Sequence, residues 1–326
     1  MNNTQKKPFG TIDNHDFWLY TIENNYLKAE ITNFGATLVS LIEKTTGHNC
    51  VLNNENVNQY LENINEALGA TIGRNANRIQ DGKFKINNQQ YQCFINNGPN
   101  SLHGGKDGFM KKEFIIKQHT NDSLSLFYHS CHLEEGFPGN LDLVITYRLM
   151  DNNLIYEIEG ISDQDTIFNI TNHSYFNLCD DTILNHYLKI PTNHFSLVDK
   201  YGLTLATTNN VDSSFDFRKP TKIKDNFQLQ HPNLLLANGL DHNYIFENSD
   251  DDLRAILSYN DLVLSVRSDL PDMHVYTGNY LRKKHRGIAL ECQYYPNSIN
   301  YTDFKKPILL ANKLVKHYIK YIIERI

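Results

Sequence analysis

The chain has 326 residues, of which 40% are hydrophobic and 21% charged, enough material for the core of one large domain or two smaller ones. Its formal net charge of −6 gives no electrostatic footprint for nucleic acid or an anionic membrane, so neither is expected as a partner. No stretch approaches the roughly 18 apolar residues of a membrane span, and the N-terminal MNNTQKKPFG lacks the apolar segment of a secretory signal, so we expect a cytoplasmic protein.

Short segments typical of β-strands dominate the chain. They mix β-branched and aromatic residues with polar alternation, and Gly, Asn, Asp and Pro separate them. In chain order they are FWLYTIEN (residues 17–24), YLKAEITNFGATLVSLIE (26–43), GKFKINNQQYQCFI (82–95), SLSLFYHS (123–130), LDLVITYRLM (141–150), NLIYEIEGI (153–161), DTIFNIT (165–171), YLKIP (187–191) and LVLSVRSD (262–269). A tight turn at residues 151–153 predicts a hairpin between the fifth and sixth of these.

Helix signals are sparse. The best candidates are NVNQYLENINEAL (residues 56–68) and ILLANKLVKHYIKYIIERI (308–326), and the second is equally compatible with a strand followed by a basic tail. The chain contains no long Pro/Gly/Ser linker and no repeat of 20–50 residues. The pattern therefore predicts a single all-β domain over residues 1–326, a large sandwich with few short helices.

Five polar segments interrupt the strand pattern and hold the candidate functional residues. They are GATIGRNANRI (residues 69–79), NSLHGGKDGF (100–109), NITNHSYFNL (169–178), GLDHNY (239–244) and ALECQYYPNSIN (289–300). Glu291 stands out, because a carboxylate flanked by apolar residues is costly to bury unless it is paired or used. Strand alternation is also compatible with a Glu291 that faces solvent. His173 fits either a satisfied polar group in a half-buried strand or a group that transfers protons.

The remaining polar candidates each have a structural interpretation as well. His103, which precedes two glycines, is typical of a turn, Arg78 fits an ion pair within the fold, and Asp241 fits a turn. The basic segment RKKHR (residues 282–286) has no Gly-rich cradle or helix start beside it, which favours a solvated loop over a phosphate site.

Metal and nucleotide motifs are absent from the sequence or fail on geometry. HSCH (residues 129–132) is compact, but alternate side chains of a strand point to opposite faces and cannot converge on one ion. The chain has no HExxH, no P-loop and no GxGxxG after a strand. The cysteines form an odd, scattered set without CxxC, which argues against a disulfide framework and a zinc ribbon: Cys50, Cys93, Cys131, Cys179 and Cys292.

Taken in chain order, the polar segments resemble the aldose 1-epimerase (galactose mutarotase) family. ITNFGATLVSLIEKTTGHNCVL (residues 31–52) is similar to the family's opening segment, GRNANRI to its GR.ANRI, and NSLHGG…GF to its LHGG..GF. TNHSYFNL is similar to its TNHtYFNL, LDHNY to its lDhny, and ALECQYYPNSIN to its E.Q..PDa.N. The resemblance implies a large antiparallel β-sandwich of the galactose mutarotase type, with a sugar cleft across one sheet and neither cofactor nor metal.

The resemblance also implies site residues and a partner. The matching positions are Glu291 as catalytic base, His173 as catalytic acid, His103 as a second active-site histidine, and Arg78, Asn77 and Asp241 as hydroxyl-binding residues. The implied partner is a small-molecule aldose such as glucose or galactose, and the implied assembly is a monomer or homodimer.

Three features depart from the family pattern. Asn297 in PNSIN stands where the family usually has Asp, and His274 in DMHVYTGN stands where many members carry Gln or a small or apolar residue. The loop between YTGNYL and IALECQ is shorter and more basic than in many relatives. The changes at Asn297 and His274 do not touch Glu291 or His173, but both bear on which sugar fits, and the loop bears on the rim of the cleft.

The implied chemistry suits these residue types. Interconverting the anomers of a sugar requires opening a cyclic hemiacetal, in which the C1 hydroxyl loses a proton and the ring oxygen gains one. A carboxylate suits the first transfer and an imidazolium the second, because the imidazole pKa of about 6.5 lies near neutral pH. A positioned acid or base typically contributes about 10²–10⁴-fold. A partner that orients His173 is expected, but the sequence does not identify it. Tyr175 and Tyr276 fit sugar stacking or, more simply, core packing.

Other functions stay open on the sequence. Asp241 and Glu291 fit the carboxylate pair of a glycoside hydrolase. The RKKHR segment fits a 1-epimerase of hexose 6-phosphates. A non-catalytic sugar-binding protein is a further alternative, although a pure binder has no need of the matched acid and base that Glu291 and His173 supply.

Overall fold

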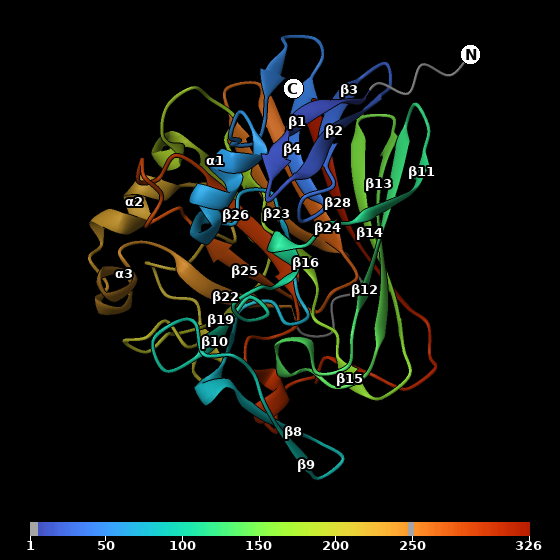
Figure 1. The fold of residues 1–326 in the computed structure, drawn as a ribbon. Coiled ribbons are helices and arrows are strands. Elements are labelled where there is room, and N and C mark those ends of the chain that lie inside the picture. Colours follow the sequence, from blue (N-terminus) through green and yellow to red (C-terminus); the bar gives the residue numbers. More distant parts are fainter. Residues whose placement is uncertain (1–5, 247–250) are drawn as a thin grey trace.

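The computed structural model describes residues 6–246 and 251–326, which form three large antiparallel sheets, four two-stranded sheets and three short helices (Figure 1). The largest sheet has nine strands in the spatial order β11 Ile115–His119, β12 Ser123–Ser130, β13 Leu141–Met150, β14 Asn153–Ser162, β28 Val315–Arg325, β24 Leu262–Ser268, β23 Leu253–Tyr259, β18 Tyr187–Lys189 and β21 Thr221–Lys222.

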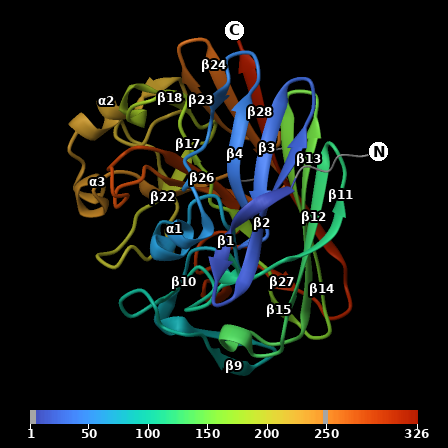
Figure 2. The ribbon, with the colours of Figure 1, turned by 45° about the horizontal axis from the view of Figure 1, so that its top comes forward.

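Two further sheets accompany the nine-stranded sheet. The N-terminal sheet has the order β1 Lys6–Ile12, β2 His15–Glu23, β3 Leu27–Thr32, β4 Thr37–Glu43 and β5 His48–Asn49. The six-stranded sheet has the order β17 Tyr175–Phe176, β26 Ile288–Gln293, β25 Asp272–Tyr276, β22 Asp241–Ile245, β19 His194–Ser196 and β20 Asn209–Asn210. In Figure 2 the N-terminal sheet (blue) lies in front of part of the nine-stranded sheet.

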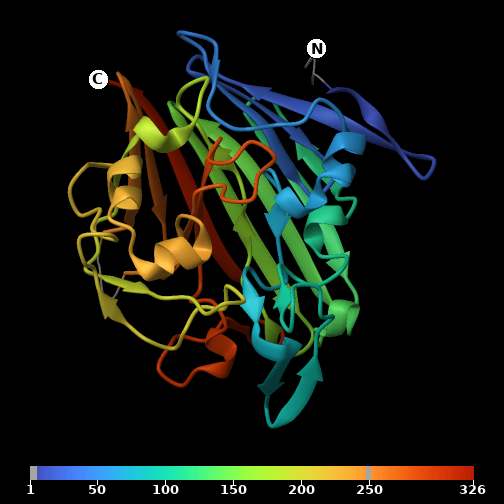
Figure 3. The ribbon, with the colours of Figure 1, turned by 90° about the vertical axis from the view of Figure 1, so that its left-hand side faces the viewer.

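Small elements complete the fold. The two-stranded sheets pair β6 Thr71–Ile72 with β16 Thr171–Asn172, β7 Arg78–Ile79 with β10 Ser101–Leu102, β8 Lys83–Ile86 with β9 Gln89–Gln92, and β15 Thr166–Ile167 with β27 Ile308–Leu309. The α-helices are α1 Val57–Glu62, α2 Ile223–Gln228 and α3 Pro232–Ala237. Figure 3 shows these helices and the connecting loops in front of the nine-stranded sheet. None of the helices within the described ranges has the length and apolar character needed to cross a membrane.

Period-2 alternation explains how the layers meet. Along β14, Leu154, Tyr156 and Ile158 are buried while the residues between them are partly exposed. Leu154 belongs to one hydrophobic cluster that also contains Ile31 of the N-terminal sheet and Val275 of the six-stranded sheet. The nine-stranded sheet therefore shares its core with both other sheets. The predicted all-β sandwich with few short helices is confirmed, and a single domain over residues 1–326 stays a prediction.

The structure agrees with most of the predicted elements. The hairpin is confirmed as β13 and β14, which pair from Met150–Asn153 outwards, with Asp151 in the left-handed conformation (φ 53°) that a tight turn requires. The first predicted helix is shorter than expected: α1 starts after Asn56, whose side chain accepts a hydrogen bond from the Gln59 backbone N–H (3.1 Å). Helices α2 and α3 were not predicted.

The C-terminal segment is a strand, so its interpretation as a helix is wrong. The alternative of a strand followed by a basic tail is right about the strand, but β28 runs to Arg325 and leaves no basic tail. Ile319, Tyr321 and Ile323 of β28 are buried at every second position, which is a strand period. The strand lies between β14 and β24 and pairs with both. Burial between two neighbouring strands outweighs the intrinsic helical propensity of this segment.

A buried arginine joins the polar segment GRNANRI to the edge of the nine-stranded sheet. Arg74 is 2% exposed, and its guanidinium donates to the carbonyls of Ser130 (2.8 Å), Cys131 (2.9 Å) and Pro138 (2.7 Å), and to the Ser130 hydroxyl. The Ser130 hydroxyl in turn donates to the Glu134 carboxylate. Arg74 therefore has a structural role, and only the second arginine of the segment, Arg78, remains as a site residue.

We expect Arg74→Met to lower the free energy of unfolding by about 3 kcal/mol, because it leaves several buried carbonyls without a donor. Chemical denaturation measures this change. The matched control is Arg148→Met: Arg148 is 47% exposed and pairs with Glu157 at 3.2 Å, so a loss below about 1 kcal/mol is expected. Equal losses in the two variants would contradict the role of Arg74.

Candidate active site

Three neighbouring strands of the six-stranded sheet present polar side chains on one face. Leu290 and Cys292 belong to the hydrophobic core, so strand alternation turns Glu291 to the opposite face. There Glu291 of β26 lies across from His274 of β25. Asp241 of β22 lies on the same face, two residues before Asn243, which pairs with His274. Glu291 does not reach solvent by this alternation, because it is only 1% exposed.

The amide-rich segment NITNHSYFNL supplies His173 between β16 and β17. Its backbone is tied to the loop before β6: the His173 N–H donates to the Ala70 carbonyl (2.9 Å), and the Gly69 N–H donates to the His173 carbonyl (3.0 Å). The Asn172 side chain donates to the Gly69 carbonyl (2.9 Å) and accepts from the Ser174 N–H (3.1 Å). The polar neighbours of His173 therefore make hydrogen bonds to the backbone, and these bonds fix the position of the histidine.

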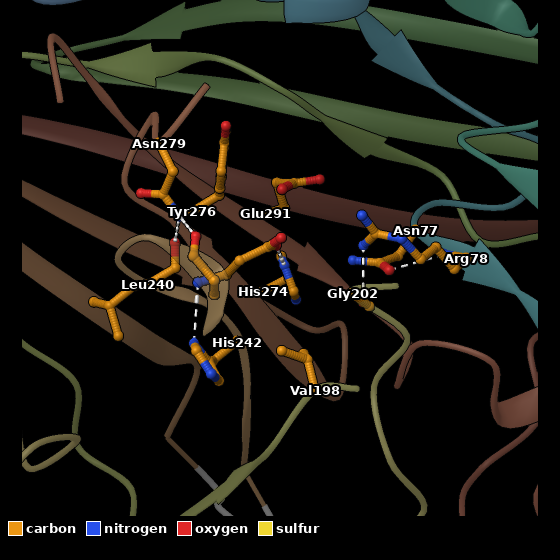
Figure 4. A network of polar contacts seen from close by, with 12 residues as sticks. Asn77, Arg78, Val198, Gly202, Leu240, His242, His274, Tyr276, Asn279 and Glu291 are labelled. Atoms are coloured by element: carbon orange, nitrogen blue, oxygen red, sulfur yellow. Dashed lines mark hydrogen bonds and ion pairs between the residues drawn. The ribbon is translucent and has the colours of Figure 1, made fainter. Parts of the chain in front are cut away.

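A cavity of about 440 Å³ lies over this face, and all six site residues predicted from the sequence line it: Asn77, Arg78, His103, His173, Asp241 and Glu291. Five separate parts of the chain therefore meet in one place. The cavity wall also includes His274, Tyr175 and Tyr276. Figure 4 shows Glu291, His274 and Arg78 around the same space.

Glu291 and His173 form a close, buried pair. The His173 Nε2 lies 3.6 Å from the Glu291 Oε1, and their side chains are 6% and 2% exposed. The His173 ring packs against the ring of Tyr175 (4.9 Å between centroids) and edge-on against that of His103 (5.4 Å). Within the described part of the chain, His173 Nδ1 makes no hydrogen bond to another side chain. The expected partner was a neighbouring carboxylate or a hydrogen-bonding group; the Glu291 carboxyl lies beside the ring, and packing against two rings orients the imidazole.

Burial shifts the proton affinities of the pair in opposite directions. It raises the pKa of the Glu291 carboxyl well above its usual range, with the charge of Asp241 as a second cause. It lowers the pKa of the His173 imidazole to about 4. Both shifts have one origin, because a cavity that excludes water disfavours the charged form of each group. In the free protein the one proton of the pair therefore rests on the carboxyl.

His103 is oriented by the neighbouring segment of the site. The Asn77 backbone N–H donates to His103 Nδ1 (3.3 Å), which makes Nδ1 the acceptor and places the proton of the neutral ring on Nε2. Burial, and next the neighbouring His173, hold the pKa of His103 well below its usual range. His103 is thus a neutral N–H donor.

The same tautomer bears on metal binding. His103, His173 and Glu291 place one possible ligand atom each within 4.8 Å of one another, and no other group of this kind is found in the part of the chain that the structure describes. A metal needs an unprotonated ring nitrogen. Because the Asn77 N–H engages Nδ1 of His103, its Nε2 carries the proton, so the trio fits a bound hydroxyl better than a metal ion.

Arg78 is held in place by two loops. Its Nε donates to the Asn97 side-chain oxygen (3.0 Å) and its Nη1 to the Gly202 carbonyl (2.9 Å), while its backbone N–H donates to Asn77 Oδ1 (2.8 Å) (Figure 4). The turn that contains Gly202 is closed by Asp199, whose carboxylate accepts from the Leu203 N–H (2.9 Å). No motif in this turn signals the contact with Arg78, so the turn was not predicted as part of the site.

Asp241 has a partner that the sequence analysis did not foresee. The His274 Nε2 donates to Asp241 Oδ1 at 2.7 Å. Burial opposes ionisation of Asp241, but this hydrogen bond and the electrostatic effects of His274, Arg78 and His242 together outweigh it and hold the pKa of the carboxyl below its usual range. His274 was noted only as a departure from the family. Its position between the core residues Met273 and Val275 was the available signal that it faces the opposite side, with the site.

The other singled-out segments do not line the cavity. In HSCH, His129 pairs with Asp142 on an exposed strand and His132 accepts from the Gly139 N–H, so their side chains do not converge, as predicted. Asn297 has φ 60° and its Oδ1 accepts from the Gln80 N–H (3.1 Å), which makes it a turn residue outside the cavity wall. In the RKKHR segment, Arg282 pairs with a glutamate, as described below.

The fold and the site together define an all-β protein with a buried acid–base pair in a polar cavity. The family model described as "Aldose 1-epimerase" matches residues 19–321. The chain therefore belongs to the aldose 1-epimerase family, a family of isomerases.

Individual relatives agree with this family. The chain is 33% identical over 315 residues to pig (Sus scrofa) galactose mutarotase, covering 89% of both chains, and 32% identical over 328 residues to Haemophilus influenzae aldose 1-epimerase, covering 92% of this chain and 93% of the other. The solved structure of galactose 1-epimerase from Lactobacillus acidophilus superposes with a TM-score of 0.89 at 29% identity, over 100% of this chain and 99% of that one.

We expect the His173 ring to stay neutral in the sugar-free protein from pH 8 down to about pH 5, because burial lowers its pKa to about 4. Nitrogen-15 chemical shifts of the histidine rings measure the protonation state, and the His173→Asn variant identifies the signal. A titration midpoint near 6.5, the ordinary value for histidine, would contradict the burial argument.

Proposed function

We propose that this protein is an aldose 1-epimerase that interconverts the α- and β-anomers of free aldoses such as glucose and galactose. The observation that carries the proposal is the buried pair of Glu291 and His173, 3.6 Å apart in a polar cavity. The two oxygens that exchange protons in this reaction, O1 and the ring oxygen O5, are both bonded to C1. An acid and a base that serve them must therefore lie close together, as these two groups do.

In the proposed mechanism, Glu291 accepts the proton of the C1 hydroxyl as the C1–O5 bond breaks. The electron pair of that bond stays on O5, which takes the proton of the His173 imidazolium, and C1 becomes an aldehyde. Rotation about the C1–C2 bond presents the other face of the aldehyde to O5. Ring closure then reverses both transfers, and the pair regains its first protonation state.

Burial of the pair sets a cost before the ring-opening step. Because burial raises the pKa of Glu291 and lowers that of His173, the free protein holds the proton on the carboxyl. That proton must pass to His173 before the carboxylate can act as the base. Ring opening then returns both groups to their neutral forms and recovers this cost.

The remaining residues of the cavity suit sugar hydroxyls. Arg78 and the Nε2–H of His103 are donors, Asp241 is an acceptor, and the Asn77 amide supplies both kinds of group. Arg78 is held by hydrogen bonds to Asn97 and Gly202, and Asp241 by one to His274. These side chains therefore lose little conformational freedom when a sugar binds.

The RKKHR segment gives little support to a sugar-phosphate substrate. Arg282 pairs with Glu66 (3.3 Å) and donates to Asn54 (3.1 Å), and Lys283 lies 3.6 Å from Asp181. Two of its cations are thus already compensated by carboxylates, which would have to be displaced before a phosphate could bind. Free aldoses are therefore the favoured substrates.

We expect Glu291→Gln to lower kcat for mutarotation of fresh α-D-glucose or α-D-galactose by at least about 10²-fold, because the amide cannot accept the hydroxyl proton. Polarimetry measures the rate. Glu159→Gln, which removes a carboxylate from a surface ion pair with Lys316, is the matched control and should retain the wild-type rate. A wild-type rate in a folded Glu291→Gln protein would remove Glu291 as the base, whereas a wild-type protein that binds the sugar without accelerating mutarotation would favour a non-catalytic binder. Release of reducing sugar from a chromogenic glycoside would instead favour a hydrolase.

We expect Lys284→Glu to leave kcat/KM for free hexoses unchanged within about twofold, and the wild type to prefer free hexose over hexose 6-phosphate. The reason is that the basic segment lies outside the cavity wall. Polarimetry with both substrates provides the test. A strong preference for the phosphate that disappears in Lys284→Glu would support the sugar-phosphate alternative.

A further inference from the structure

His274 occupies a special place in the polar face of the six-stranded sheet. It lies between Asn243 and Glu291 in the cross-strand register and is only 1% exposed. Its one hydrogen bond to a side chain in the described part of the structure runs from Nε2 to Asp241 Oδ1 at 2.7 Å. The imidazole therefore lies in the cavity wall and engages one oxygen of a carboxylate that faces the same cavity.

Asp241 is tethered through its backbone as well. Its N–H donates to Nδ1 of His242 (3.0 Å), and the Nε2 of His242 contacts the Asn233 side-chain oxygen at 2.7 Å. Because Nδ1 accepts, the proton of the neutral His242 ring lies on Nε2, which donates to Asn233. Asp241 is thus held at two points, by His242 on its main chain and by His274 on its carboxylate.

The His274 bond changes what Asp241 can offer to a ligand. A carboxylate with both oxygens free accepts hydrogen bonds in many directions and from two hydroxyls at once. With Oδ1 engaged by His274, the carboxylate is fixed about its own bonds, and Oδ2 remains as the acceptor for the cavity. Pre-ordering of this kind improves binding because less side-chain freedom is lost when the ligand arrives.

We propose that His274 is a positioning residue for substrate recognition, which holds the Asp241 carboxylate so that its free oxygen accepts one sugar hydroxyl. This inference rests on the proposed function, because it assigns the ligand of Asp241 as an aldose. It concerns binding rather than proton transfer, since the His274 contact is made with Asp241 and not with the pair of Glu291 and His173. The effect of removing His274 should therefore fall on KM.

The test compares KM and kcat for mutarotation of fresh α-D-galactose and α-D-glucose in the wild type, His274→Leu and His274→Gln. We expect His274→Leu to raise KM about tenfold, because a hydrogen bond to a charged group is lost, while kcat stays within about threefold. Glutamine can donate an N–H to Asp241, so His274→Gln should recover most of the wild-type KM. A purely structural role would not produce this separation of KM from kcat or the rescue by glutamine.

A double-mutant cycle then identifies the partner. In an Asp241→Asn background, His274→Leu should have little further effect on KM, since the carboxylate that it positions is already gone. Should the leucine variant not fold, His274→Asn replaces it, because its amide is too short to reach Asp241.

Three results would overturn the inference: an unchanged KM in folded His274→Leu, a loss confined to kcat, or a full His274 effect in the Asp241→Asn background. The wild-type measurement separates this outcome from a failure of the proposed function. A wild-type protein that does not accelerate mutarotation overturns the proposed function itself, whereas an active wild type with any of these three results overturns only the role of His274.

Discussion

The close burial of a carboxyl beside an imidazole is the constraint on which the rest of the structure depends. Glu291 and His173 come from segments more than 100 residues apart, yet their reactive atoms lie 3.6 Å from each other with almost no access to solvent. Water would reduce the effect of each group on the other and return both proton affinities towards ordinary values. The fold must therefore exclude water from this place while leaving room for a ligand.

The fold meets both requirements with two kinds of element, strands and connecting loops. Glu291 lies on β26, the second strand of its sheet, and its neighbours Leu290 and Cys292 are anchored in the shared core, which fixes its position. His173 and His103 lie in connecting segments, and each is fixed by backbone hydrogen bonds to another part of the site. A small number of local bonds thus gives loop residues the precision that strands supply through packing.

Much of this arrangement could be predicted from the sequence, but not all of it. Alternating segments such as residues 141–150 and 153–161 carry their strand signal locally, and the ordered motifs of the family pointed to six of the residues that line the cavity. The pairing of Asp241 with His274 was not predictable in the same way, because it depends on the register of β22 against β25. The turn that contains Gly202 was missed for a similar reason, since its contact with Arg78 spans 124 positions and leaves no local pattern.

The terminal segment shows the limit most clearly, and it has a consequence for how the molecule is made. β28 lies between β14 and β24 and pairs with both along most of its length, although it is the last strand of its sheet to be synthesised. Until it arrives, the strands on its two sides have no edge in common. The largest sheet therefore cannot form strand by strand during translation, because the edges of its two halves stay unpaired until β28 is made. We expect this topology to fold slowly and to need protection against aggregation.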